Sequence, residues 1–265
     1  MAEHKIGLAL GSGAVRGYAL IPIIQKLEEN SIRISAVSGS SIGALIGAHF
    51  ALYGEVESLR ETAAAMKKNE FFKLADPNNP KISMIKGRKI KDFLEEKFFG
   101  DKTFDDCGIP LAVCATDFVK KEPVYMRKGK IIDAVMASVS IPGIFPLYQM
   151  NDSYFVDGGV IDPVPVKPLR EKNLKKMIAV NLMGYDLNYK KPGKDMFSTL
   201  MTTFYLMMEQ LAKHENKENL YTIDLNFKPD PVNMVAFYEW EKYFNAGKKH
   251  IEKHMDKILE WLESA

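Results

Sequence analysis

The chain has 265 residues, of which 46% are hydrophobic and 26% charged, an ordinary composition that can bury a full core. Its formal net charge is only +2 and the charges are mixed along the chain, so the sequence gives no electrostatic case for nucleic acid as a partner. The length suits one large domain or one and a half.

The N-terminus leads directly into the first expected strand. Residues 1–5 lack the long apolar segment and cleavage site of a signal peptide. No apolar run of the chain reaches the roughly 18 residues of a membrane span. Cys107 and Cys114 have no set of metal-binding partners and are expected to be ordinary thiols. We therefore expect a cytoplasmic protein.

Strands and helices are expected to alternate along the first half of the chain. Residues 6–10 predict a buried strand, and the glycine-rich turn at 11–17 follows it. A helix is predicted over 18–29, beginning or bending near Pro22. The next expected elements are a strand at 34–38, helices at 42–53, 55–68, 88–99 and 131–138, strands at 111–116 and 123–127, and irregular chain at 71–86 and 141–146.

The second half continues this alternation. A short strand at 154–156 leads into Asp157, and the further predicted elements are strands at 177–182 and 221–225 and helices at 196–213 and 246–262. Residues 184–194 are the best candidate for a boundary. The pattern predicts an α/β fold with a mainly parallel sheet. Ligand sites in such sheets form at the carboxyl ends of the strands, where we place the turns at Gly11, Ser41 and Asp157.

The segment Gly39-Ser40-Ser41-Ile42-Gly43 fits Gly-x-Ser-x-Gly, the nucleophile elbow of serine hydrolases. The pattern has a steric reason. The middle serine occupies a strained turn, and its small neighbours let the strand and the helix approach each other closely. An ordinary Gly/Ser turn stays open as an alternative on this stretch alone.

The glycine-rich turn presents backbone N–H groups at the start of a helix, where they can bind a phosphate or an oxyanion. A dinucleotide site needs Gly-x-Gly-x-x-Gly and an acidic residue after the second strand. Here the spacing of Gly11, Gly13 and Gly17 is one residue too long, and the second strand ends without a carboxylate. Nucleotide binding therefore ranks below acyl chemistry, and a plain strand-to-helix turn remains the simplest alternative.

A base must activate Ser41, and histidine is the usual one. None of the five histidines follows a strand in a loop rich in glycine or proline; they are His4, His49, His214, His250 and His254. We expect His49, two turns beyond Ser41 in the same helix, to point away from it. Ser41 also follows only the second strand, whereas an α/β-hydrolase places its nucleophile after several strands. The sequence therefore predicts a Gly-x-Ser-x-Gly hydrolase in which the order of strands and motifs differs from that of the α/β-hydrolases.

With its motifs in this order, the chain resembles the bacterial patatin-like phospholipases over about residues 5–185. The resemblance rests on the loop ending in Arg16-Gly17, the elbow, and Asp157-Gly158-Gly159, with support from Ala115-Thr116-Asp117 and Ala137-Ser138. It implies a three-layer α/β/α fold. It further implies one domain over residues 1–265, with the motifs in 5–185 and a C-terminal region in 186–265.

The same resemblance implies a Ser–Asp dyad that needs no histidine, metal or cofactor. Ser41 corresponds to the nucleophile, Asp157 to the base, and the N–H groups of Gly13 and Ala14 to the oxyanion donors. The supporting motif residues are Gly11, Ser12, Arg16, Gly17, Gly39, Gly43, Gly158 and Gly159. Ser12 and Ala14 stand where the family usually has glycine, and Ala14 matters if its φ must be positive.

Only the Asp-Gly-Gly match selects Asp157 over its sequence neighbours Asp152 and Asp162. An ordinary aspartate has a pKa of ~3.9, so we expect partial burial to raise the pKa of this base. The expected substrates are phospholipids or simpler fatty acyl esters, met at a transient membrane contact, with loops 71–84 and 141–148 shaping the acyl pocket. An acyltransferase using His214, or a silent lipid- or nucleotide-binding protein, remain as alternatives; the oligomeric state stays open.

Overall fold

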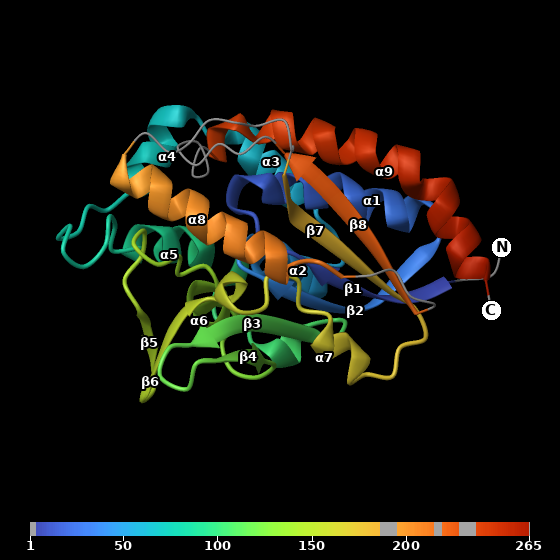
Figure 1. The fold of residues 1–265 in the computed structure, drawn as a ribbon, viewed down its shortest axis with the longest axis horizontal. Coiled ribbons are helices and arrows are strands. Elements are labelled where there is room, and N and C mark those ends of the chain that lie inside the picture. The colour runs from blue at the N-terminus through green and yellow to red at the C-terminus, as the bar shows by residue number, and fades with distance from the viewer. Residues whose placement is uncertain (1–3, 186–194, 215–218, 228–236, 265) are drawn as a thin grey trace.

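The computed structural model of the chain describes residues 4–185, 195–214, 219–227 and 237–264. Within these residues, eight strands form one sheet in the order β5-β6-β3-β2-β1-β7-β8, with β4 also paired to β3 (Figure 1). The strands are β1 (His4–Leu10), β2 (Ile32–Ser40), β3 (Leu111–Asp117), β4 (Glu122–Met126), β5 (Tyr148–Met150), β6 (Ser153–Asp157), β7 (Met177–Tyr185) and β8 (Leu220–Phe227). Strands β1, β2, β3, β7 and β8 run parallel to one another. Strands β4 and β6 each pair antiparallel with β3, and β5 pairs antiparallel with β6.

The alternation of side chains along β1 separates two hydrophobic cores. Ile6, Leu8 and Leu10 belong to the larger core, together with helices α1 (Leu20–Glu29), α2 (Ile42–Tyr53), α6 (Ile131–Ser138) and α9 (Trp240–Glu263). Ala9 points to the opposite core, which includes α7 (Lys167–Arg170) and α8 (Met196–Leu211). Helices therefore cover both faces of a mostly parallel sheet, which confirms the predicted α/β fold.

The predicted helices 42–53 and 131–138 match α2 and α6 from end to end. The remaining helices are α3 (Glu57–Ala65), α4 (Lys68–Leu74) and α5 (Arg88–Leu94), and α5 continues into a π-helical turn, Glu95–Phe99. The prediction that residues 71–86 are irregular is wrong for α4, because the proline and asparagine residues that break regular structure begin only at Pro77.

The C-terminal elements join the same sheet. Strand β8 pairs with β7, and α9 packs against α1, as Figure 1 shows. Of the predicted boundary at 184–194, residues 186–194 lie outside the described part of the chain, so the single-domain organisation stays a prediction. Among the described residues, no helix has both the length and the apolar character required to cross a membrane.

Candidate active site

Ser41 lies in the sharp turn between β2 and α2, with φ 55° and ψ −124°, a conformation that non-glycine residues rarely adopt. A Cβ atom at Gly39 would lie 2.3 Å from the Gly43 carbonyl oxygen, and one at Gly43 would lie 2.2 Å from that of Leu10. Larger residues at either position would force β2, α2 and β1 apart. The local steric requirement that predicts an elbow is therefore met.

Asp157 reaches the elbow from an antiparallel strand. The register pairs Ser40 with Cys114 of β3, and the next residue of β3, Ala115, pairs with Asp157 of β6. The elbow and the end of β6 thus lie on either side of β3. The prediction that all three turns leave strands in the same sense is wrong for Asp157, because β6 runs in the opposite direction and ends part-way along β3.

The serine and the aspartate form a direct hydrogen bond. Ser41 Oγ donates to Asp157 Oδ2 at 2.6 Å, and the Gly159 N–H donates to the other carboxylate oxygen at 2.7 Å. The backbone of Asp157 is also held, since its N–H donates to the Ser140 carbonyl at 2.9 Å and its carbonyl accepts from Thr116 Oγ1 at 3.1 Å. The carboxylate is therefore fixed in orientation toward the hydroxyl.

The environment of Asp157 changes its acidity. Only 1% of the residue is exposed, and this burial raises its pKa to about 7, against the opposing effect of the hydrogen bonds from Ser41 and Gly159. A group with a pKa near neutrality can both take and return a proton at neutral pH. Burial thus gives this carboxylate the acidity that a general base requires.

The glycine-rich loop lies between the elbow and the Asp157 turn. Ser12 Oγ donates to Ser40 Oγ at 3.0 Å, and a Cβ atom at Gly159 would lie 2.7 Å from Ser12 Oγ. At its far end, a Cβ atom at Gly17 would lie 2.1 Å from Ile42 Cγ1. Because the loop packs on both neighbours, its backbone is held close to the elbow and to the Asp157 turn.

The N–H groups of Gly13 and Ala14, the expected oxyanion donors, have no hydrogen-bond partner among the described residues. By contrast, the Ser12 N–H donates to the Pro163 carbonyl at 2.8 Å. Ala14 has φ 48°, a left-handed conformation that favours glycine. The departure from the glycine-rich pattern at Ala14 therefore falls on a strained position.

Arg16 is buried and holds the loop in place. Its Nη1 donates to the Leu182 carbonyl of β7 at 3.0 Å, and its guanidinium lies 5.5 Å from the ring centres of both Tyr205 and Phe227. These contacts tie the loop to α8 and β8. Arg16 thus fixes the loop against β7, β8 and α8.

The segments that form this site fall within the match to a known protein family. A model of the patatin-like phospholipase family matches residues 8–170, which include the loop, the elbow and the Asp157 turn. The chain belongs to the patatin-like phospholipase family. The resemblance that the sequence motifs indicate is therefore confirmed.

Relatives of this family member are longer proteins. An uncharacterised NTE family protein of Mycobacterium bovis is 32% identical over 194 residues, covering 73% of this chain and 52% of the relative. Lysophospholipase NTE1 of Cryptococcus neoformans is 31% identical over 192 residues, covering 70% of this chain and 12% of its own length. The chain therefore spans about half the length of the mycobacterial relative. The solved structure of VipD from Legionella pneumophila has a similar fold, with a TM-score of 0.51, 15% identity and coverage of 96% of this chain and 67% of VipD.

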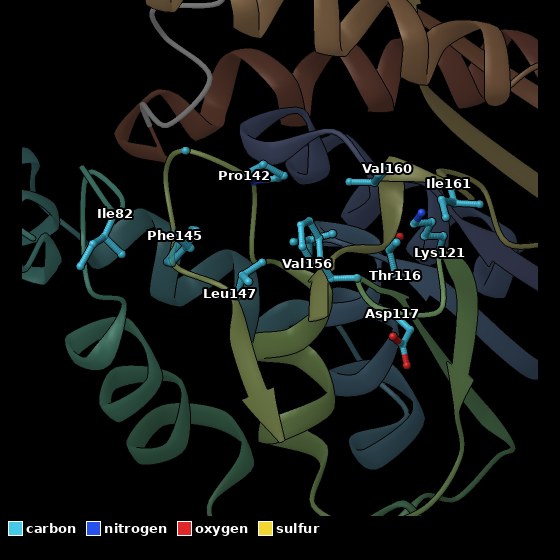
Figure 2. A pocket seen from close by; sticks show the side chains of 12 residues that line it. Ile82, Thr116, Asp117, Lys121, Pro142, Phe145, Leu147, Val156, Val160 and Ile161 are labelled. Carbon is cyan, nitrogen blue, oxygen red and sulfur yellow. The ribbon is translucent and has the colours of Figure 1, made fainter. Parts of the chain in front are cut away.

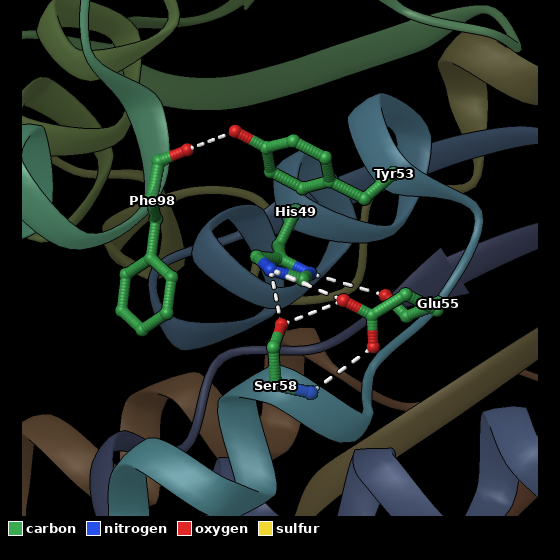
Figure 3. Close-up of polar contacts among 5 residues, drawn as sticks. All are labelled: His49, Tyr53, Glu55, Ser58 and Phe98. Atoms are coloured by element: carbon green, nitrogen blue, oxygen red, sulfur yellow. Dashed lines mark hydrogen bonds and ion pairs between the residues drawn. The ribbon is translucent and has the colours of Figure 1, made fainter.

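His49 of this patatin-like chain belongs to a separate polar cluster (Figure 3). Its Nδ1 lies 3.1 Å from the Glu55 carbonyl oxygen and its Nε2 lies 2.9 Å from Ser58 Oγ. The Ser58 hydroxyl also donates to Glu55 Oε1 at 2.6 Å. Burial lowers the pKa of His49. The cluster joins the end of α2 to the start of α3, so His49 points away from Ser41 as predicted.

The other histidines are also held elsewhere. His214 Nε2 lies 3.1 Å from the Val164 carbonyl oxygen, and the rings of His250 and His254 stack on α9. Among the described residues, no hydrogen bond joins a histidine to Ser41 or Asp157. The rival carboxylate Asp162 accepts a hydrogen bond from Tyr125 at 2.6 Å, and Asp152 lies exposed in the β5–β6 turn.

Ser138 is a site residue that the sequence marked only as part of a lesser family signature. It ends α6, and its Oγ accepts a hydrogen bond from the Ser41 N–H at 2.8 Å. The same hydroxyl donates to the Cys114 carbonyl at 2.6 Å. Ser138 thus links the backbone of the elbow to β3. The signature Ala137-Ser138 and its position at the end of a helix rich in small residues are the signals that point to Ser138.

A cavity of about 460 Å³ lies beside the end of β6, and Figure 2 shows the side chains that line it. Thr116, which bonds the Asp157 backbone, and Val156, which precedes Asp157, form part of its wall, although Ser41 and Asp157 are not among its lining residues. Both loops predicted to shape an acyl pocket contribute to the lining, the first through Ile82 and the second through Pro142, Gly143, Phe145 and Leu147. The lining is mostly apolar and therefore suits a hydrocarbon chain.

Proposed function

We propose that this chain is a serine lipid acyl hydrolase that cleaves fatty acyl esters of the phospholipid, lysophospholipid or simple ester type. One observation carries the proposal, the 2.6 Å hydrogen bond from Ser41 Oγ to the buried carboxylate of Asp157. Membership of the patatin-like phospholipase family and a fungal relative named lysophospholipase support lipid esters as the substrate class. The apolar cavity beside the end of β6 supports a substrate with a hydrocarbon chain.

The first half of the proposed reaction forms an acyl-enzyme. Ser41 Oγ attacks the ester carbonyl carbon while its proton passes to Asp157 Oδ2. The carbonyl oxygen becomes an oxyanion and accepts hydrogen bonds from the N–H groups of Gly13 and Ala14. When the tetrahedral intermediate collapses, the C–O bond to the leaving alcohol breaks. Protonated Asp157 gives its proton to that alcohol.

The second half releases the fatty acid. A water molecule transfers a proton to Asp157 and attacks the carbonyl carbon of the acyl-serine, forming a second oxyanion on the same donors. Collapse breaks the bond to Ser41 Oγ, which takes the proton back from Asp157. The pKa of about 7 suits this exchange, because the carboxylate is ionised enough to accept a proton and basic enough to hold it.

A fluorophosphonate probe and a soluble p-nitrophenyl ester test the proposal. We expect the wild-type chain to be labelled and to hydrolyse the ester, and the variant Ser41→Ala to lose both. Asp157→Asn should lower hydrolysis by a factor of at least 10², in the range of a general base. Ser58→Ala is the matched control, because the Ser58 hydroxyl contacts a histidine whereas that of Ser41 contacts an aspartate, and this variant should keep both signals. Labelling that persists in Ser41→Ala would contradict the proposal.

The acyltransferase alternative depends on a histidine partner. Since His214 faces the Val164 carbonyl, we expect His214→Ala to retain ester hydrolysis. Loss of hydrolysis in that variant, with Ser41 still labelled, would favour the acyltransferase. A folded wild-type chain with neither labelling nor hydrolysis would instead favour a silent binding protein.

A further inference from the structure

Exposed apolar side chains surround the mouth of the cavity. Ile82, Phe118 and Leu147 line the cavity and are still 63%, 56% and 42% exposed. Met84 and Val119, close to them in the chain, are 54% and 64% exposed. These five side chains, here named the apolar rim, come from the α4–α5 connection, the β3–β4 turn and the segment before β5. Three separate segments therefore present apolar groups around one opening.

Lysines flank the apolar rim. Lys81 precedes Ile82, and Lys120 follows Val119; both lysines are exposed. The neighbouring carboxylate of Asp117 is buried, and its Oδ1 accepts the N–H groups of Val119 and Lys120. Phe118 and Val119 at the tip of this turn face solvent, and Lys120 keeps 64% of its side chain exposed, with its Nζ 4.0 Å from Asp117 Oδ2. Apolar side chains next to lysines are typical of surfaces that enter the interfacial region of a membrane.

The location of the rim favours a lipid surface over a soluble partner. In Figure 1, the α4–α5 connection and the β5–β6 hairpin lie at the end of the molecule opposite the start of β1 and the end of α9. The rim opens into the cavity whose wall includes Thr116 and Val156, the neighbours of Asp157. A lipid leaving a bilayer at this end would therefore enter an apolar cavity directly, without crossing water.

We propose that the apolar rim docks on a bilayer that contains anionic lipids. The rim side chains enter the interfacial region, and Lys81 and Lys120 contact headgroup phosphates. Only the delivery of an ester to Ser41 rests on the proposed function, because docking needs no catalysis. Binding can therefore be measured separately from hydrolysis.

Co-sedimentation of the Ser41→Ala protein with vesicles of phosphatidylcholine and phosphatidylglycerol tests the docking. The double change Met84→Ser and Val119→Ser avoids the cavity lining, and we expect it to weaken binding about tenfold, since each apolar group stabilises the bound state. Lys81→Gln with Lys120→Gln should weaken binding about tenfold on these vesicles and leave binding to pure phosphatidylcholine unchanged.

A matched control uses the other exposed apolar surface, on α8. Met207 and Leu211 are 59% and 48% exposed, and Met207→Ser with Leu211→Ser should leave vesicle binding unchanged. The proposal is overturned if the rim variant binds vesicles like the parent, or if the α8 variant is the one that loses binding. It is also overturned if the parent is a dimer that the rim changes dissociate, since a second copy would then cover the rim.

The two proposals can fail separately. In the active protein, the rim variant should hydrolyse a soluble p-nitrophenyl ester like the wild type and hydrolyse vesicle lipid about tenfold more slowly. Rim-dependent vesicle binding without any ester hydrolysis would contradict the proposed function and leave the docking surface intact. Ester hydrolysis together with vesicle binding that does not depend on the rim would contradict the docking surface and leave the proposed function intact.

Discussion

Replacing Asp157 with asparagine should stabilise the fold at alkaline pH while it removes activity. Asparagine has the size of aspartate and can still accept the Gly159 N–H, which lies 2.7 Å from the carboxylate. Its amide group can donate to Ser41 Oγ, whose hydrogen then turns away. The main change is the loss of a group that the folded chain must bury as an anion above its pKa.

The sign and size of the effect follow from the raised pKa of Asp157. The folded value is about 7 and the ordinary value is 3.8. Below the ordinary value the carboxyl is protonated in both states and its contribution to stability is fully present. That contribution is lost as pH rises toward 7, and the total change amounts to roughly 4 kcal/mol. The advantage of Asp157→Asn should therefore be about 2–3 kcal/mol larger at pH 8 than at pH 5.

Urea unfolding of both proteins between pH 5 and pH 8 measures this difference. The wild-type midpoint should fall relative to the variant as pH rises, with unchanged slopes. Asp152→Asn removes a carboxylate that lies exposed in the β5–β6 turn, and it should give a difference that does not vary with pH. A constant difference for Asp157→Asn over the same range would refute the argument that burial sets the acidity of the base.

Three further predictions concern the same site. The kcat/KM for ester hydrolysis should be half-maximal near pH 7 and fall about tenfold per pH unit below it, because Asp157 must be ionised to accept a proton. A kcat/KM that stays constant from pH 5 to 8 would argue against Asp157 as the base. Ser138→Ala leaves the Ser41 N–H without its partner, so urea unfolding should show a loss of about 1–3 kcal/mol and kcat should fall; unchanged values would make this bond dispensable. Ala14→Gly removes the strain of φ 48° and should raise stability by about 0.5–1 kcal/mol in thermal unfolding; a lower melting temperature would mean that the alanine methyl contributes more than the strain.

Features governed by local rules could be predicted from the sequence. The elbow is one, because small residues on both sides of Ser41 are needed wherever a strand turns so sharply into a helix. The ends of α2 and α6 are others, since Tyr53 precedes a glycine with φ 68°, and Ser138 precedes a segment with two prolines. The prediction for residues 71–74 failed for a local reason too. Pro77 and Pro80 break regular structure only near themselves, and they do not prevent a helix that ends at Leu74.

Features that depend on pairing between distant segments could not be predicted. The direction of β6 is set by its register with β3, and the residues from Ser153 to Asp157 carry no sign of it. The bond between Ser138 and the Ser41 N–H joins residues 97 positions apart. Motif matching selected Asp157 over Asp162, but only the fold explains the choice, since Tyr125 holds the Asp162 carboxylate.

Among the described residues no histidine forms a hydrogen bond with Ser41, so in the proposed reaction Asp157 must itself have a pKa near neutrality. An imidazole has a pKa near ~6.5 without help, whereas a carboxylate must be buried to approach that value. Burial in turn requires that the carboxylate meet the hydroxyl directly, because an intervening polar group would help to solvate the anion and lower its pKa again. The antiparallel β6 meets this requirement by ending opposite Ala115, and Gly158 allows it because a Cβ atom there would lie 2.3 Å from the Cys114 carbonyl oxygen. The strand direction that the sequence could not predict is therefore what brings the Asp157 carboxylate to the Ser41 hydroxyl, as the proposed role of Asp157 as the base requires.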